Sequence, residues 1–361
     1  MEEEKSQQTS TPQTEQTQKV PGGLNINTER VSLLTIGMAG SGKTTFVRSL
    51  VQYLLFSQQD PAYVLNLDPA VQFLPYTPNG DIRQTIDYKK LMKEHQLGPN
   101  GAIMTALNLF CAQIDETINN IEATSHTSKH VVVDTPGQIE VFTWSASGSI
   151  ITQTLLTSMP TVLLYVLDLA RCQNPNSFMS NMMFCCSIFY KMKLPMIIVL
   201  NKEDAADKEK VLGWIRDYQK LLEEFQNYDS YLSTFSKSMV LSLDEFYNQL
   251  RVVAVSSLKM TGFDQLKEAI ASAKQEFMDV QYKDLVKNYN RRMAEEQEKQ
   301  QKELKKFMKD YKKTEEQNKK KKPEAPLNVQ VSHVGPTKSK KDDEEKEIKK
   351  AEEKIQKMNI E

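Results

Sequence analysis

Short apolar runs alternate with longer amphipathic segments along most of this chain. Each run is rich in β-branched residues and ends in a polar or turn-forming cluster. Near-continuous apolarity over so short a stretch is typical of a strand buried on both faces of a sheet. The runs cover 31–36, 62–67, 130–133, 161–167, 196–200 and 252–255. Helical spacing between them, clearest at 44–56, 178–191 and 263–273, predicts an α/β fold with a mostly parallel, doubly wound sheet.

Charge is distributed unevenly over the 361 residues. The chain has 46 basic and 47 acidic residues, and the net charge of −1 argues against direct nucleic-acid binding. From Lys283 onward the sequence is mostly Lys, Glu and Gln, which bury too little apolar surface to offset chain entropy. We therefore expect a disordered leader over 1–28, one α/β domain over 29–282, and a charged helical or disordered tail over 283–361. Helical insertions are expected in the domain at 80–122 and 207–250.

Several locations and site types are disfavoured by the composition. No run approaches ~18 apolar residues, so we expect no membrane span. The polar start of the sequence lacks the apolar core of a secretory signal. The four cysteines, Cys111, Cys172, Cys185 and Cys186, lack the paired spacing of a zinc site. Reduced thiols are typical of cytosolic and nuclear proteins, so we expect one of these locations.

The loop after the first run carries the most specific motif. Residues 37–44 read GMAGSGKT and fit the pattern G-x-x-x-x-G-K-[ST], with a predicted strand before and a predicted helix after. Glycines let the backbone N–H groups turn inward around phosphate oxygens, and the helix N-terminus adds partial positive charge. We expect Lys43 to neutralise the β and γ phosphates and the Thr44 hydroxyl to bind Mg²⁺. The nucleotide-binding residues expected here are Gly40, Ser41, Gly42, Lys43, Thr44 and Thr45.

Two other run ends supply carboxylates. Asp134 and Gly137 follow the run at 130–133, where Asp134 could hold Mg²⁺ through water and Gly137 could offer its N–H to the γ-phosphate. Asp68 follows the run at 62–67, where it could position the waters of Mg²⁺ or the attacking water. Asp-Pro is also a common way to begin a turn, so Asp68 has a purely structural alternative. In a parallel sheet these carboxyl ends meet at one edge, which predicts a shared metal and phosphate site.

A third motif, at 201–204, indicates which base is bound. The sequence Asn-Lys-Glu-Asp follows the run at 196–200. The Asp204 carboxylate can accept hydrogen bonds from N1–H and the N2 amino group of guanine, and Asn201 can reach its O6 and N7 side. Adenine has no such pair of donors, so the wrong base would leave Asp204 unpaired. With Lys202 from the same motif and Ser256 after the last run, these residues predict GTP and GDP as ligands.

Together the motifs resemble those of the GPN-loop GTPases. Besides the phosphate loop, the resemblance rests on Asn-Leu-Asp-Pro-Ala at 66–70, Gly-Pro-Asn at 98–100, Asp-Thr-Pro-Gly-Gln-Ile-Glu at 134–140 and the motif at 201–204. They occur in the family's order over about residues 31–278. The sequence around the phosphate loop and the charged tail are most similar to those of the first eukaryotic subtype of this family.

The resemblance implies a dimer and a place in the cell. In this family the Gly-Pro-Asn loop of one protomer, here Gly98, Pro99 and Asn100, reaches the phosphates bound by the other. Asn100 therefore joins the catalytic candidates as an amide donor. The dimer partner would be a second copy or a paralogous GPN-loop GTPase. The resemblance also implies assembly and nuclear import of RNA polymerase II, contact with its subunits, and shuttling between cytoplasm and nucleus.

The mechanism we expect is Mg²⁺-dependent hydrolysis of GTP by an in-line water, in which the protein contributes mostly positioning and electrostatic stabilisation. Three residues are candidates for orienting the water: Asp68, Gln138 and Glu140. A non-hydrolytic assembly scaffold, which needs nucleotide only for folding, is the alternative function. An ATP-driven relative is disfavoured by Asp204.

Overall fold

The chain is described here by a computed structural model, which covers residues 26–124, 126–226, 239–240, 246 and 250–320. Its strands are β1 (Val31–Ile36), β2 (Tyr63–Asn66), β3 (Gly80–Asp81), β4 (His130–Asp134), β5 (Thr161–Asp168), β6 (Met196–Asn201) and β7 (Arg251–Val255). Within the described residues they form one seven-stranded sheet in the order β3-β2-β4-β1-β5-β6-β7, and every pairing is parallel. The predicted α/β class and doubly wound sheet are confirmed. Only the two-residue β3 has no counterpart among the predicted runs, because it is too short to show a pattern.

The sheet is buried on both faces because its strands are apolar throughout. All six residues of β1 and all eight of β5 are buried. Successive side chains point to opposite faces, so Leu34 and Tyr165 belong to one hydrophobic cluster while Leu33 and Leu164 belong to the other. The two clusters are the two halves of one domain core.

Helices cover each of these faces. The face of Leu33 is covered by α1 (Lys43–Gln58) and α13 (Phe263–Glu276), which contribute residues such as Phe46 and Leu266. The face of Leu34 packs against side chains from helices that come from both halves of the chain. These are α4 (Pro99–Cys111), α5 (Ile114–Ala123), α6 (Ile139–Thr143), α7 (Ala146–Ser158), α8 (Pro175–Met192), α9 (Lys208–Arg216) and α10 (Tyr218–Gln226).

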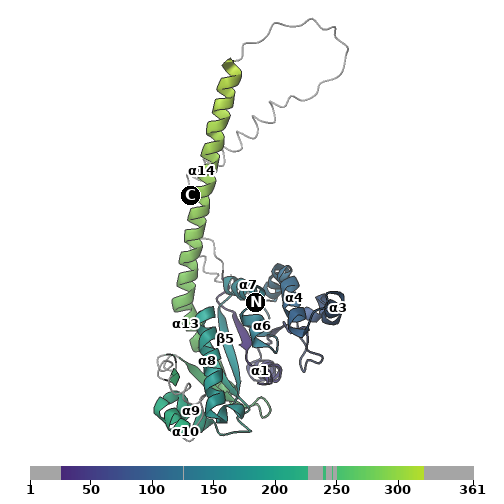
Figure 1. The fold of residues 1–361 in the computed structure, drawn as a ribbon, viewed down its shortest axis with the longest axis vertical. Coiled ribbons are helices and arrows are strands. Elements are labelled where there is room, and N and C mark those ends of the chain that lie inside the picture. Colours follow the sequence, from purple (N-terminus) through teal and green to yellow (C-terminus); the bar gives the residue numbers. More distant parts are fainter. Residues whose placement is uncertain (1–25, 125, 227–238, 241–245, 247–249, 321–361) are drawn as a thin grey trace, which may run out of the picture. The chain divides into compact units, whose positions relative to one another are not determined.

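The two insertions lie over different parts of the domain. The first holds the short α2 (Ile82–Thr85), α3 (Tyr88–Glu94), α4 and α5, as the sequence predicts for 80–122. In Figure 1, α3 and α4 lie beside each other on the side opposite α9 and α10. The second insertion begins with α9 and α10, and most of its remainder, 227–249, lies outside the described residues.

The chain divides into two compact units, residues 1–296 and 297–361. The 3-10 turn η1 (Arg171–Gln173) precedes α8, and the π-helix η3 (Phe277–Gln281) leads into α14 (Tyr282–Lys320), which begins in the first unit and ends in the second. The predicted leader lies outside the described residues except for 26–28. In this short stretch Ile26 is buried, and the backbone N–H of Asn27 donates to the carbonyl of Ser158 at 3.0 Å. The predicted domain boundaries stay predictions.

None of the helices in the described part of the chain is long and apolar enough to cross a bilayer. The four cysteines all lie in this part and are free thiols, as their spacing predicts.

Candidate nucleotide-binding site

The turn between β1 and α1 can be made only with glycine at defined positions. Gly40 and Gly42 have φ angles of +80° and +90°, which side chains rarely adopt. A Cβ on Gly37 would lie 2.3 Å from the Val166 carbonyl oxygen of neighbouring β5. The loop therefore runs directly against the sheet, and α1 begins at Lys43 with its first N–H groups at the loop. This is the cradle for phosphate that the motif predicts.

Lys43 is held inside this loop by the loop's own backbone. Its side chain is buried, and Nζ donates to the carbonyls of Gly37 at 2.8 Å and Met38 at 3.1 Å. Burial lowers the pKa of Lys43, and the carboxylates of Asp134 and Asp68 act against this shift. The ammonium group is thus placed beside the two predicted acidic residues but is bonded to neutral oxygens.

Asp134, the last residue of β4, is 1% exposed, and only one of its two carboxylate oxygens accepts a hydrogen bond within the described residues. Its Oδ2 accepts a 2.7 Å hydrogen bond from the Tyr76 hydroxyl, whereas Oδ1 has no hydrogen-bond partner within the described residues. Burial raises the pKa of this carboxyl to about 6, against the effects of Tyr76, Thr44 and Lys43. A buried oxygen without a partner carries a free-energy penalty, so it marks a place where a cation or water completes the site.

The donor set fits Mg²⁺. Mg²⁺ prefers oxygen ligands and is usually held by one or two protein groups together with substrate phosphates and water. Asp134 and the Thr44 hydroxyl are groups of this kind, and Thr44 already lowers the pKa of Asp134. No cluster of three or more His, Cys, Asp or Glu side chains suited to a metal occurs in the described ranges, so a dedicated all-protein metal cage is not formed there.

Asp68 and Gly137 are joined to each other. Oδ2 of Asp68 accepts from the backbone N–H of Gly137 at 3.1 Å, and Oδ1 accepts from the N–H of Ala70 at 2.9 Å. The Gly137 N–H, predicted to face the γ-phosphate, is therefore occupied by a carboxylate oxygen. Gln138 and Glu140, the other two water-orienting candidates, are exposed at the start of α6.

Asn201 cross-links three parts of the site. Its Nδ2 donates to the Ser41 carbonyl at 3.1 Å, and its Oδ1 accepts from the Ser257 hydroxyl at 2.8 Å and from the Lys202 N–H at 2.9 Å. Because both ends of this buried amide are engaged, its observed contacts are with the protein, whereas the sequence suggested contact with the base. The bonds hold the end of β6 and the segment after β7 against the phosphate loop.

Among the other residues predicted to recognise the base, Asp204 presents its carboxylate at the surface. Asp204 is exposed and accepts a short hydrogen bond from the Ser256 hydroxyl, which lowers its pKa. Lys202 reaches across to Asp168 at 2.7 Å and to the Gly40 carbonyl at 3.2 Å. Asp204 therefore stays charged and accessible at the end of the sheet, as guanine recognition requires.

The Gly-Pro-Asn residues lie elsewhere. Gly98 is the N-cap of α4, Pro99 its first residue, and Gly98, Pro99 and Asn100 are all exposed. A Cβ on Gly98 would meet nothing within 4 Å, and the Tyr88 hydroxyl donates to the Pro99 carbonyl at 3.4 Å. Within the described residues, no hydrogen bond connects these three residues to the phosphate loop. The structure thus brings together the candidate residues at the strand ends. The Gly-Pro-Asn tip, residues 98–100, is exposed and has no hydrogen bond to the phosphate loop within the described residues.

Three residues of the site were not among those expected to form it. Tyr76, which bonds Asp134, comes from an irregular loop whose sequence has no telling spacing. Asp168 ends β5, and the rule used for Asp68 and Asp134 could have found it. Arg83 is an ion-pair partner of Asp81 at 2.6 Å and donates to the Val71 carbonyl at 3.1 Å, so it braces the loop that carries Tyr76.

Known proteins share this architecture. The family described as "Conserved hypothetical ATP binding protein" matches residues 35–276. GPN-loop GTPase 1 of Dictyostelium discoideum is 43% identical over 267 residues, which cover 74% of this chain and 67% of that protein. GPN-loop GTPase 1 of Saccharomyces cerevisiae is 46% identical over 262 residues, covering 70% and 68%. The chain belongs to the GPN-loop GTPases.

This membership confirms the predicted resemblance and identifies a GTP-hydrolysing enzyme. The structure of this GPN-loop GTPase is similar to that of an apo GTPase from Pyrococcus abyssi, with a TM-score of 0.60 and 26% identity over 68% of this chain and 98% of the other. The family description mentions ATP, whereas these relatives are named GTPases. The exposed, charged Asp204 favours guanine.

Removing the Asp204 carboxylate tests the choice of base. We expect Asp204→Ala to weaken GTP binding about 10- to 100-fold, because two guanine donors lose a charged acceptor, while ATP binding changes little. Competitive binding of the two nucleotides to the GPN-loop GTPase measures this. Asp115→Ala, which removes an exposed carboxylate from α5, is the control. An equal loss for both nucleotides would contradict a role in base discrimination.

Proposed function

We propose that this GPN-loop GTPase hydrolyses GTP in a Mg²⁺-dependent reaction, with Asp134 and Thr44 as the protein groups that hold the ion. The observation that carries the proposal is the buried, unpartnered Oδ1 of Asp134 beside Lys43 and Thr44. When bound, the ion neutralises charge on the phosphate oxygens.

Lys43 and the backbone of its loop bind the phosphates. The Lys43 ammonium exchanges its neutral carbonyl partners at Gly37 and Met38 for charged phosphate oxygens, which make stronger hydrogen bonds. The backbone N–H groups from Gly40 to Thr45 donate hydrogen bonds to the remaining phosphate oxygens at the helix N-terminus. The exchange draws Lys43 outward without unfolding the loop, because Asn201 holds the Ser41 carbonyl.

Asp68 links binding to hydrolysis. A γ-phosphate oxygen and the Asp68 carboxylate compete for the same Gly137 N–H, and like charges repel. GTP binding therefore displaces Asp68 from Gly137 and frees it to accept a hydrogen bond from the attacking water. That water adds to the γ-phosphorus, the bond to the β-phosphate oxygen breaks, and GDP and inorganic phosphate leave. Gln138 and Glu140, both exposed, are the other residues able to orient the water.

The Gly-Pro-Asn tip acts on a second protomer. Its exposure, its fixed position at the start of α4 and its lack of hydrogen bonds to the phosphate loop of its own chain, within the described residues, support action in trans. Pro99 pre-sets the backbone and Gly98 leaves the approach open, so the Asn100 amide can donate to a phosphate oxygen of the partner. The partner is a second copy or a paralogous GPN-loop GTPase; relatives named GPN-loop GTPase 2 support the existence of such paralogues.

In the cell, we propose, the GTPase cycle drives assembly and nuclear import of RNA polymerase II, with the protein shuttling between cytoplasm and nucleus. The family resemblance supports this role, and the two states of the Gly137 N–H provide a switch that partners could sense. Copurification of polymerase subunits with the full chain, weakened by Lys43→Ala, tests it.

Single-turnover hydrolysis separates an enzyme from a scaffold. We expect the wild type to hydrolyse GTP above background, and at least one of Asp68→Ala, Gln138→Ala and Glu140→Ala to slow the reaction about 100-fold at unchanged GTP affinity, as expected for loss of a water-orienting group. Gln265→Ala, an exposed glutamine on α13, is the control. Background-level rates for all proteins, wild type included, would favour the non-hydrolytic scaffold.

Mixed dimers test action in trans. Lys43→Ala and Asn100→Ala chains are coexpressed with different tags and purified through both. Each mixed dimer then holds one complete site, so we expect about half the wild-type rate, while each variant alone stays near background. If Asn100 acts on its own chain, neither site in the mixed dimer is complete and the rate stays at background. Asn119→Ala, an exposed asparagine on α5, should behave as wild type.

A further inference from the structure

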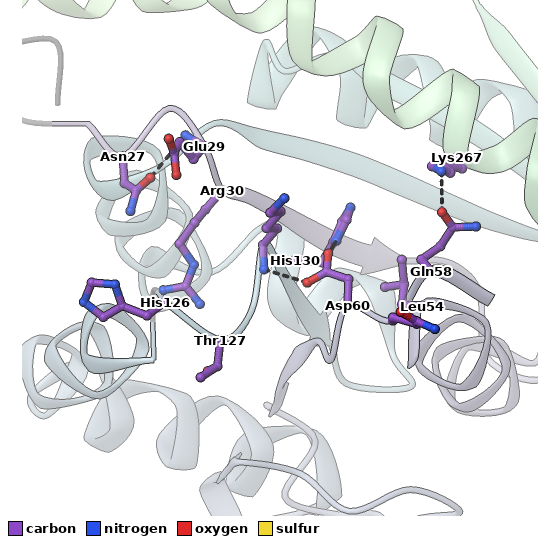
Figure 2. A pocket seen from close by; sticks show the side chains of 12 residues that line it. Asn27, Glu29, Arg30, Leu54, Gln58, Asp60, His126, Thr127, His130 and Lys267 are labelled. Carbon is purple, nitrogen blue, oxygen red and sulfur yellow. Dashed lines mark hydrogen bonds and ion pairs between the residues drawn. The ribbon is translucent and has the colours of Figure 1, made fainter. Parts of the chain in front are cut away.

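A polar pocket of about 590 Å³ lies at the opposite end of the sheet from the phosphate loop. Arg30, Asp60, Lys129, His130 and Lys267 line it, and we call it the basal pocket (Figure 2). Arg30 directly precedes β1 and Lys129 directly precedes β4, and the strand register pairs the next residues, Val31 and His130. The nucleotide loop follows the other end of β1, about 20 Å away for six residues of strand.

Arg30 is a buried cation that makes no direct ion pair within the described residues. Its side chain is 2% exposed. Burial lowers the pKa of Arg30, and the charges of Glu122 and Asp60, which lie beyond ion-pair distance, act against this shift. The guanidinium donates only to neutral oxygens, the carbonyl of Ile121 and the hydroxyls of Ser128, at 2.8 Å, and Thr124, at 3.5 Å. Its Nε has no partner at all in the described part of the chain. A charge buried in this way is unfavourable unless an anion completes it.

A structural role explains only part of this arrangement. Ile121 lies in the last turn of α5, and an arginine at a helix C-terminus is stabilised by the helix dipole. The dipole supplies about half an elementary charge, and the carbonyl and hydroxyls leave Nε unsatisfied. The helix end positions Arg30 but does not neutralise it.

Other groups around the pocket make its potential positive. Lys129 and Lys267 are exposed at its rim, and Lys267 donates to the Gln58 side chain. Burial lowers the pKa of His130, the hydrogen bond and charge of Asp60 oppose this shift, and the charges of Lys274 and Lys129 add to it. Lys129 likewise adds to the lowering of the pKa of Lys274. Burial is the largest cause of both shifts, and the neighbouring lysines add to it.

The acidic residues of the lining do not cancel this positive potential. Asp60 is already used: its Oδ2 lies 2.6 Å from Nδ1 of His130, as Figure 2 shows, and its Oδ1 accepts from the Lys129 N–H at 3.1 Å. Glu29 is exposed, and its backbone N–H bonds the Asn27 side chain. Among the lining residues, with His130 neutral, the three cations outnumber the carboxylates of Asp60 and Glu29 by one. Glu122, which does not line the pocket, acts on the charge of Arg30 from outside it.

We infer that the basal pocket binds a small molecule through a phosphate group, at a second site separate from the nucleotide. The two exposed ammonium groups of Lys129 and Lys267 can reach a ligand, and the buried guanidinium of Arg30 adds positive potential near them. Such a set suits the several oxygens of a phosphate better than the two of a carboxylate. The volume is that of a site for a whole small molecule, so a body is attached to the phosphate. The polar lining selects a hydrophilic body, such as a sugar.

The test uses the full chain saturated with GDP and Mg²⁺, so that the nucleotide loop is blocked. Ribose 5-phosphate is titrated by calorimetry, with ribose as the matched neutral probe and inorganic phosphate as competitor. We expect saturable binding of ribose 5-phosphate, displacement by phosphate, and no binding of ribose. The double variant Lys129→Gln/Lys267→Gln should bind at least about tenfold more weakly, the effect of losing one charged hydrogen bond.

Controls keep folding and the nucleotide site apart from this result. Lys283→Gln, a surface charge removed from the start of α14, should bind as wild type. The double variant changes only exposed side chains and should retain wild-type GTP hydrolysis, which separates this inference from the proposed function. No saturable binding of ribose 5-phosphate up to about 10 mM, or equal binding by the double variant and wild type, would overturn it.

Discussion

Parallel pairing is the constraint on which the whole site depends. Because every strand of the described sheet runs the same way, the residues that follow β1, β2, β4 and β6 emerge at one edge. The site brings together Lys43, Asp68, Asp134 and Asn201. The first and the last of these are more than 150 residues apart in the sequence, yet all four lie at the same edge of the sheet. No local interaction could assemble them. The burial of both sheet faces stabilises the pairing, and the pairing in turn positions the chemistry.

Within that edge, the protein's own groups occupy the places that the nucleotide needs. Lys43 is bonded to loop carbonyls, Gly137 to the Asp68 carboxylate, and Tyr76 to one oxygen of Asp134. These contacts satisfy the polar groups of the site, and the proposed binding of GTP replaces those of Lys43 and Gly137. Asn201 serves differently: its contacts brace the phosphate loop and do not compete with the phosphates.

The two ends of the sheet differ in how they handle charge. At the carboxyl ends, Lys43 lies beside two carboxylates, so the site holds charges of both signs, as the proposed binding of a phosphate together with Mg²⁺ requires. At the amino ends, the hydrogen-bond partners of the buried Arg30 are all neutral, and its nearest carboxylates, Glu122 and Asp60, lie beyond ion-pair distance. A site with carboxylates beside its cation suits a metal-bound triphosphate, whereas a pocket whose lining cations outnumber its carboxylates suits an anion alone.

The sequence by itself determined the fold class, the order of the strands along the chain and the chemistry at their ends. Runs such as 31–36 and 161–167 are apolar enough to be strands only in a sheet covered on both sides, and GMAGSGKT has one structural context. Local composition and spacing carry this information. Only the tertiary structure decided which atoms meet: that Tyr76 bonds Asp134, that Asp68 holds the Gly137 N–H, that Asn201 braces Ser41, and that the buried Arg30 donates to the Ser128 hydroxyl. These contacts join residues far apart in sequence, through loops that have no periodicity, so they exist only once the strands have packed.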